Sequence, residues 1–265
     1  MTVAPTNSLP AVWDRVVCGI DGSAASLEAA RLVARLMPAS AQLTLCAIVN
    51  PAGVEGGVLL EQTLTREAEG ALDQVQGEIA ASHDSEVHLR EGPPTRLLVE
   101  EAVSERATLL AVGSHGHSRS AGIALGSVAT AMLHDAPCSV LIARGTARDY
   151  APRGGEIFVG FDGSGGAHRA LGVGRERSER LSLRLRVLVA TGDTLPRGPG
   201  WLGEELDSQL AVSEDPRTAV EALVAASESA GLLILGSRHL RGVPALSSVS
   251  ERVAHRASGP VLVVR

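Results

Sequence analysis

Short apolar runs alternate along the chain with longer segments in which apolar residues recur every three to four positions. The short runs predict buried β-strands and the longer segments predict amphipathic α-helices. In the first half of the chain the expected strands are Arg15–Ile20, Gln42–Val49, Glu86–Leu89, Leu109–Val112 and Ser139–Ala143. The expected helices are Ala24–Leu36, Leu59–Ala81, Pro94–Arg106 and Ser127–His134. This alternation predicts an α/β fold with a parallel, doubly wound sheet and right-handed crossovers.

The same pattern starts again after a polar, Gly- and Arg-rich segment, Gly145–Gly155, which we interpret as a linker. A strand followed by Asp-Gly-Ser occurs at Val16–Ser23 and again at Ile157–Ser164. LLAVGS at 109–114 is echoed by LLILGS at 232–237, and the final strand of each half is followed by arginine. An internal repeat of this length indicates tandem copies of one unit. We therefore expect two doubly wound domains, residues 1–145 and 154–265.

Composition excludes several classes of function. Hydrophobic residues make up 45% and aromatic residues 2% of the 265, so the core must consist of Ala, Val and Leu. The net charge of −6 is dispersed and no basic block or aromatic ladder occurs, which argues against nucleic acid as a partner. No basic amphipathic helix or apolar run of about 18 residues suggests a membrane. Residues 1–13 resemble a loose leader rather than a signal peptide.

The three cysteines, Cys18, Cys46 and Cys138, lie inside apolar strand-like runs. Such positions are typical of reduced, buried thiols in a cytoplasmic protein. No Cys/His cluster has the spacing of a zinc site, so the sequence predicts no metal ligands. We expect a soluble, cytoplasmic protein.

One stretch combines several glycines with a strand and a helix start: LLAVGSHGHSRSAGIALGSV at 109–128. Its glycines have the spacing G-x-x-G-x9-G-S, which includes Gly113, Gly116 and Gly126-Ser127. Glycine allows a backbone to approach a ligand closely, and a helix start offers free N–H groups to a phosphate. The spacing fits neither a dinucleotide fingerprint nor a Walker loop, and the chain contains no lysine. The pattern favours a nucleotide-phosphate site, and the alternative is a set of tight turns.

With Asp-Gly-Ser after the first strand and this glycine pattern after the fourth, each half resembles the universal stress protein family. The likeness covers roughly residues 14–144 and 156–265. It implies a five-stranded parallel sheet in the order 3-2-1-4-5. It also implies that the glycine motif places the first half in the family's nucleotide-binding branch, which holds ATP or ADP, often with a divalent cation such as Mg²⁺ or Mn²⁺. In that order the first and fourth strands are neighbours, and ligands bind at such switch points.

The resemblance implies a role for each matching residue. Asp21 faces the adenosine part, although it could instead cap the following helix. Ala47 offers backbone groups to the adenine edge, and Val112 ends the strand beside the site. The remaining site residues contact the ribose and phosphates: Gly113, Gly116, Gly126, Ser127 and Val128. His115, His117 and Arg119 are weaker candidates on the same loop.

The second copy differs at two places. It is shorter by about eighteen residues between its Asp-Gly-Ser and the Glu-Asp-Pro step, with a Pro/Gly-rich loop Thr191–Gly200 and a short segment Trp201–Leu206 in place of the long helix. His239 stands where Gly116 stands in the first copy, and Ser247 stands where Gly126 does. We therefore expect the first half alone to bind nucleotide, and Asp162 to serve its helix rather than a ligand.

The expected function is a nucleotide-dependent sensor or regulator of a stress response, whose protein partner the sequence does not identify. Two alternatives are a slow ATPase or nucleotidyl-transfer enzyme on the same scaffold, and an interaction module without nucleotide. The final strands of both halves are short, apolar sheet edges without lysine, so each needs a partner. We expect them to pair antiparallel in an intramolecular pseudo-dimer, and further homodimerisation stays open.

Overall fold

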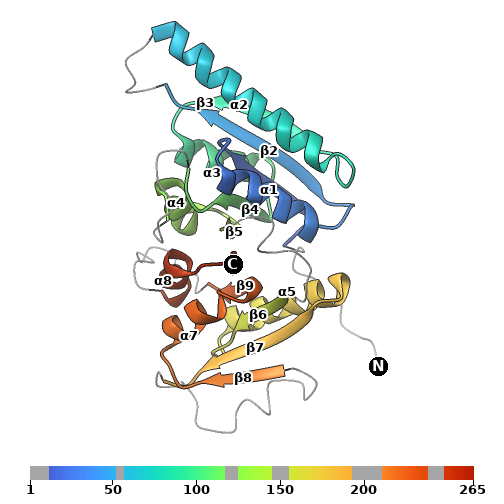
Figure 1. The fold of residues 1–265 in the computed structure, drawn as a ribbon, viewed down its shortest axis with the longest axis vertical. Coiled ribbons are helices and arrows are strands. Elements are labelled where there is room, and N and C mark those ends of the chain that lie inside the picture. The colour runs from blue at the N-terminus through green and yellow to red at the C-terminus, as the bar shows by residue number, and fades with distance from the viewer. Residues whose placement is uncertain (1–11, 52–56, 117–124, 145–154, 193–210, 238–247) are drawn as a thin grey trace.

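The computed structural model describes residues 12–51, 57–116, 125–144, 155–192, 211–237 and 248–265 (Figure 1). The first half contains β1 (Arg15–Ile20), α1 (Ala24–Leu36), β2 (Gln42–Val49), α2 (Gly57–Ile79), β3 (Glu86–Glu91), α3 (Pro94–Ser104), β4 (Leu109–Gly113), α4 (Ser127–Asp135) and β5 (Ser139–Ala143). The second half contains β6 (Glu156–Gly160), α5 (Gly165–Leu181), β7 (Arg184–Ala190), β8 (Ala211–Asp215), α7 (Ala219–Ala226), β9 (Ala230–Gly236), α8 (Val249–Arg256) and β10 (Val261–Val264). The α/β alternation read from the sequence is confirmed, and the differences are confined to element ends.

All ten of these strands belong to one sheet, in the order β3-β2-β1-β4-β5-β10-β9-β6-β7-β8. Each half therefore has the expected order 3-2-1-4-5, with parallel pairing inside it. Between β1 and β4 the connections diverge, because β2 and β3 lie to one side of β1 and β5 lies beyond β4. Figure 1 shows the two halves one above the other, with α2 along the outer part of the upper sheet.

The two half-sheets join through β5 and β10, the pair that the sequence predicts. These strands run antiparallel, with Val140 opposite Val263, Leu141 opposite Leu262 and Ile142 opposite Val261. Both strands are fully buried, so their apolar side chains and backbone hydrogen-bonding groups are all covered. The outcome is one continuous sheet rather than two separate ones.

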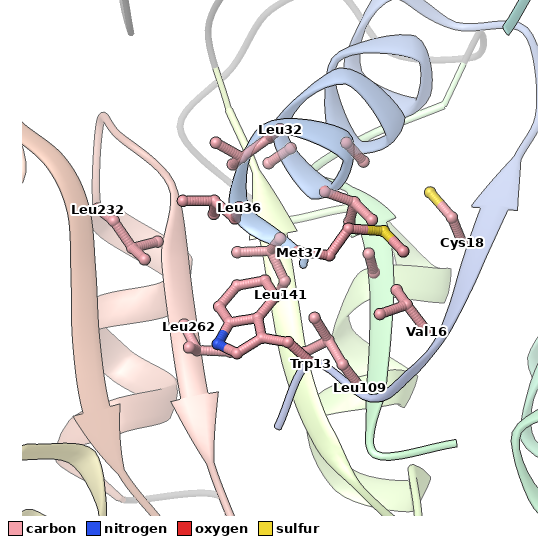
Figure 2. Packing of buried hydrophobic residues seen from close by; sticks show 14 of the residues in the cluster. Trp13, Val16, Cys18, Leu32, Leu36, Met37, Leu109, Leu141, Leu232 and Leu262 are labelled. Carbon is pink, nitrogen blue, oxygen red and sulfur yellow. The ribbon is translucent and has the colours of Figure 1, made fainter. Parts of the chain in front are cut away.

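Helices cover both faces of the sheet, and each face has its own core. One core packs under α1, α2 and α5, and the other under α3, α4, α7 and α8. The first core is continuous across the two halves, as Figure 2 shows around Trp13, whose ring lies near Leu141 and Leu262. Trp13 is 0% exposed, and the guanidinium of Arg177 from α5 stands 5.1 Å from the centre of its ring. Trp13, in the segment before β1, thus packs against residues of both halves.

Some sequence predictions fall outside the described residues. These are the linker 145–154, most of the loop Thr191–Gly200, the segment Trp201–Leu206, and the positions His117, Arg119, His239 and Ser247. Within the described ranges, no helix combines the length and the apolar character that crossing a bilayer requires.

Candidate functional site

A cavity of about 480 Å³ opens at the carboxyl ends of β1 and β4. This is the position at which the strand order changes direction, where open α/β sheets bind ligands. Its lining comes from β1, β2, β4, the starts of α1, α3 and α4, and the loop after β4: Gly19, Ile20, Asp21, Ser26, Cys46, Ile48, Pro94, Leu98, Val112, Gly113, His115, Gly116, Gly126, Ser127, Val128 and Ala129.

Seven of the eight residues predicted from the sequence line this cavity: Asp21, Val112, Gly113, Gly116, Gly126, Ser127 and Val128. The eighth, Ala47, does not. It lies inside the sheet between Ile20 and Leu89, and its side chain is buried in the core under α1 and α2. Its neighbours Cys46 and Ile48 line the cavity instead, because successive residues of a strand point to opposite faces.

Asp21 lies at the mouth of the cavity and shapes the turn into α1. Its Oδ1 accepts a hydrogen bond of 2.9 Å from the backbone N–H of Ser23. The residue that caps α1 is Ser23, whose hydroxyl oxygen accepts from the N–H of Ser26 at 3.2 Å. The alternative in which Asp21 caps α1 is therefore wrong, because the N-cap residue is Ser23, two positions further along the chain. Ser23 Oγ also donates to the carbonyl of His115 at 3.2 Å, which fastens the glycine loop to this turn.

At two positions of the motif a neighbouring group lies so close that only glycine fits, and the neighbouring group is different at each position. A side chain at Gly116 would place its Cβ 2.5 Å from Oδ2 of Asp21, so this glycine leaves room for the carboxylate. A Cβ at Gly113 would lie 2.6 Å from the backbone of Ala25 and Ser26. Gly113 therefore lets α1 pack tightly against the end of β4, a reason for this glycine that the sequence motif did not indicate.

The start of α4 leaves its N–H groups without a side-chain cap. Gly126 is the N-cap residue, with φ −68° and ψ 164°, and makes no capping bond from a side chain. Its own N–H donates to the carbonyl of Ser114 at 2.8 Å, which fixes the loop against the helix. The first turn, which begins with Ser127 and Val128, holds no acidic residue. These N–H groups and the positive helix end suit an anion.

Part of the cavity lining is apolar. Cys46, Ile48, Pro94 and Leu98 lie there, on β2 and the beginning of α3. Burial raises the pKa of the Cys46 thiol to about 12, so this side chain is neutral at physiological pH. Sequence reasoning missed these four residues. Alternation along β2 separates Cys46 and Ile48 from Ala47, but in an unbroken apolar run it does not say which face borders the cavity. The cavity thus combines apolar surface from β2 and α3 with hydrogen-bond donors at the start of α4.

His115 is the second ionisable side chain, besides Asp21, that stands among the polar lining residues. Its Nδ1 lies 2.8 Å from the hydroxyl oxygen of the buried Ser114. His115, a candidate from the sequence, therefore lies at the cavity, and a contact with Ser114 holds its ring.

In the second half, local contacts account for two residues that repeat the motif of the first half, Asp162 and Gly236. Asp162 Oδ1 accepts from the N–H of Ser164 at 3.0 Å, the same turn that Asp21 makes. A Cβ at Gly236 would lie 2.2 Å from the backbone of Gly166, which repeats the relationship of Gly113 to α1. Both features serve the packing of α5 on the sheet and need no ligand to explain them.

Comparison with known proteins gives one family. The model of the Universal stress protein family matches residues 13–144 and 203–265. A universal stress protein of Mycolicibacterium smegmatis is 27% identical, with 94% of this chain and 96% of that protein covered. A universal stress protein of Mycobacterium tuberculosis is 30% identical over 67% of this chain and 71% of its own length. The crystal structure of a universal stress protein from Archaeoglobus fulgidus has the same fold, with a TM-score of 0.72, 22% identity, and 96% and 98% of the two chains covered.

Proposed function

The chain belongs to the universal stress protein family, and we propose that its first half binds an adenine nucleotide and acts as a nucleotide-dependent regulator. One observation supports this most strongly. Seven residues that the motif singles out, from three separate segments of the chain, line a single cavity at the switch point of the sheet.

The two kinds of lining, apolar and hydrogen-bond donating, suit the two ends of a nucleotide. The base would lie against the apolar wall formed by Ile48, Pro94 and Leu98, where a flat ring buries apolar surface. The phosphates would lie at the start of α4, where Ser127 and Val128 present N–H groups. Asp21 would accept hydrogen bonds from the ribose between them. About 480 Å³ is ample for a ligand of this size.

ATP and ADP both satisfy this arrangement, and Mg²⁺ or Mn²⁺ would enter with the phosphates. Divalent cations in nucleotide sites are commonly held by one or two carboxylates together with phosphate oxygens. Asp21, the one carboxylate among the described lining residues, is used by the ribose in this arrangement, so phosphate oxygens and water would hold the cation. No step of catalysis is needed for the proposed role, and a turnover above about 1 s⁻¹ would instead identify an enzyme.

Mass spectrometry of denatured, freshly purified protein should reveal co-purified adenine nucleotide. After removal of bound nucleotide, ATP with Mg²⁺ should raise the melting temperature, since saturation at a hundred times Kd stabilises by about 2.7 kcal/mol. Gly126→Val should abolish this shift. The backbone angles at Gly126 suit any residue, but a Cβ there would stand 3.3 Å from Cα of His115, which is a tight contact, so circular dichroism should first verify that the variant folds. In the folded variant the side chain would obstruct the phosphates.

Gly70→Val in the exposed part of α2 is the matched control, since nothing lies within 4 Å of a Cβ there. It should keep the full shift. A Gly126→Val protein that folds and responds to ATP as strongly as the control would show that the phosphates do not bind at α4.

A further inference from the structure

A second group of ligand-type side chains lies outside the cavity, where β3 packs against α3. His88 comes from β3, Glu101 from the last turns of α3, and Glu105 from the C-cap position of the same helix. One ligand atom from each lies within 4.8 Å of the other two. They converge because Glu101 and Glu105 are four residues apart on one helix face, and His88 points from the strand toward that face.

Glu101 is the fixed member of this group. It is 4% exposed, and its Oε1 is in direct contact with Nδ1 of His88. Its other oxygen, Oε2, accepts a hydrogen bond of 3.2 Å from Arg90. Arg90 is held in turn by Glu100, also at 3.2 Å. Arg90 thus orients the Glu101 carboxylate through Oε2, as outer partners orient a metal ligand, and Oε1 is directed toward His88.

Glu105 is placed where a carboxylate is unfavourable on its own. It ends α3, and the negative end of a helix dipole repels an anion. It also stands four residues from Glu101, and like charges at this spacing destabilise a helix. In the part of the chain that the structure describes, no hydrogen bond or ion pair reaches its carboxylate. A cation bound between the two glutamates would offset all of these unfavourable terms.

We propose that His88, Glu101 and Glu105 form a zinc site. One imidazole and two carboxylates are ligands that Zn²⁺ accepts, and water would complete a four-coordinate shell. Atoms bound to a tetrahedral zinc ion lie about 3.4 Å apart, as follows from metal–ligand distances of about 2.1 Å. Nδ1 of His88 and Oε1 of Glu101 are in direct contact, closer than this value, and the Glu105 oxygen lies within 4.8 Å of the other ligand atoms. The partly exposed His88 and Glu105 would therefore shift to admit the ion while Glu101 stays fixed. The two carboxylates neutralise the charge of the ion.

Isothermal titration of the full chain tests the site directly. The protein is first treated with a chelator, dialysed and freed of nucleotide, and then titrated with ZnCl₂. We expect one Zn²⁺ per chain from this site. Glu105→Gln and His88→Gln should each weaken binding by at least about tenfold, since even outer-shell changes cost this much. Glu105→Gln removes no contact within the described structure, so it should fold as the wild type does, which circular dichroism verifies.

Glu69→Gln is the matched control, because Glu69 is an exposed helix carboxylate on α2 that contacts neither Arg90 nor the three proposed ligands. It should bind Zn²⁺ with wild-type affinity. With Co²⁺ as a spectroscopic substitute, the wild type and the control should give the same visible absorption, and Glu105→Gln should lose it. Absence of binding to the wild type, or equal affinity in all four proteins, would overturn the proposal. Neither outcome depends on the nucleotide site.

Discussion

Arg144 and Arg265 each cap the C-terminus of a helix in the other half of the molecule. Arg144 of the first half caps α8, and Arg265 of the second half caps α4. Arg144 follows β5, and its Nη2 donates to the carbonyls of Ala254 and His255 at the end of α8, at 2.7 and 3.1 Å. Arg265 follows β10, and its Nη2 donates to the carbonyls of Met132 and Leu133 at the end of α4, at 3.3 and 2.6 Å. The antiparallel pairing of β5 and β10 makes these contacts reciprocal, and a cation at a helix C-terminus is favourable.

Loss of either guanidinium should destabilise the joined molecule. We expect Arg144→Ala to lower the free energy of unfolding by about 2 kcal/mol, because hydrogen bonds from a charged group to carbonyls are lost in a buried place. Arg265→Ala should cost a similar amount. Urea denaturation measures both. Arg184→Ala is the control, since its side chain is 86% exposed and its ion pair is long, so its effect should stay below about 0.5 kcal/mol. Arginine variants no less stable than this control would contradict the capping role.

The motif glycines at the ends of β4 and β9 should prove essential for packing, whether or not nucleotide is bound. Gly113→Ala and Gly236→Ala each force a Cβ against helix backbone, and we expect losses of about 2 kcal/mol or more. Gly77→Ala on exposed α2 meets no atom within 4 Å and should gain about 0.5–1 kcal/mol from helix propensity. Equal stability of all three in urea would mean that α1 and α5 do not approach the sheet this closely.

Calorimetry with ATP should give one site per chain, located in the first half. Asp21→Ala should weaken binding about tenfold or more, as expected for a lost hydrogen bond to a charged group. Asp162→Ala removes the corresponding turn bond in the second half and should leave affinity unchanged. Two equal sites, or a loss confined to the Asp162 variant, would assign the nucleotide to the other half.

Alkaline pH should destabilise the protein through its buried thiols. Burial raises the pKa of Cys18 to about 12, whereas the thiol in the unfolded chain titrates near 8.5. The unfolded state therefore loses its proton first, and stability falls as pH rises from about 8.5 toward 12. This thiol should account for about 2 kcal/mol of the fall between pH 7 and pH 10.

Urea denaturation at the two pH values measures that fall. Cys18→Ala should show a smaller decrease than the wild type, by about the same amount. Val17→Ala, a change to alanine at the adjacent buried strand position, should keep the full wild-type decrease. If Cys18→Ala and Val17→Ala lose stability equally with pH, the thiol does not titrate in this way.

The sequence by itself determined the elements, their order and the repeat. The elements and their order follow from local periodicity, and the repeat follows from the recurrence of Asp-Gly-Ser and of LLAVGS as LLILGS. The ends of β1, β2 and β5 were predicted as observed, because apolar runs bounded by polar or Gly residues define them. The apolar, unprotected character of β5 and β10 was also enough to predict that they pair. The converging positions of Asp21 and Gly116 followed from the strand order 3-2-1-4-5, which the family resemblance implies.

The tertiary structure alone decided what each side chain faces. Ala47 and Cys46 are adjacent in an unbroken apolar run, and only the helices packed on each face determine which of them borders the cavity. Gly113 was assigned to a ligand, but the approach of α1 gives it a packing role that no spacing reveals. His88 meets Glu101 and Glu105, and Arg144 meets α8, across separations that carry no local pattern. Periodicity is a property of neighbouring residues, whereas these contacts depend on how whole elements dock.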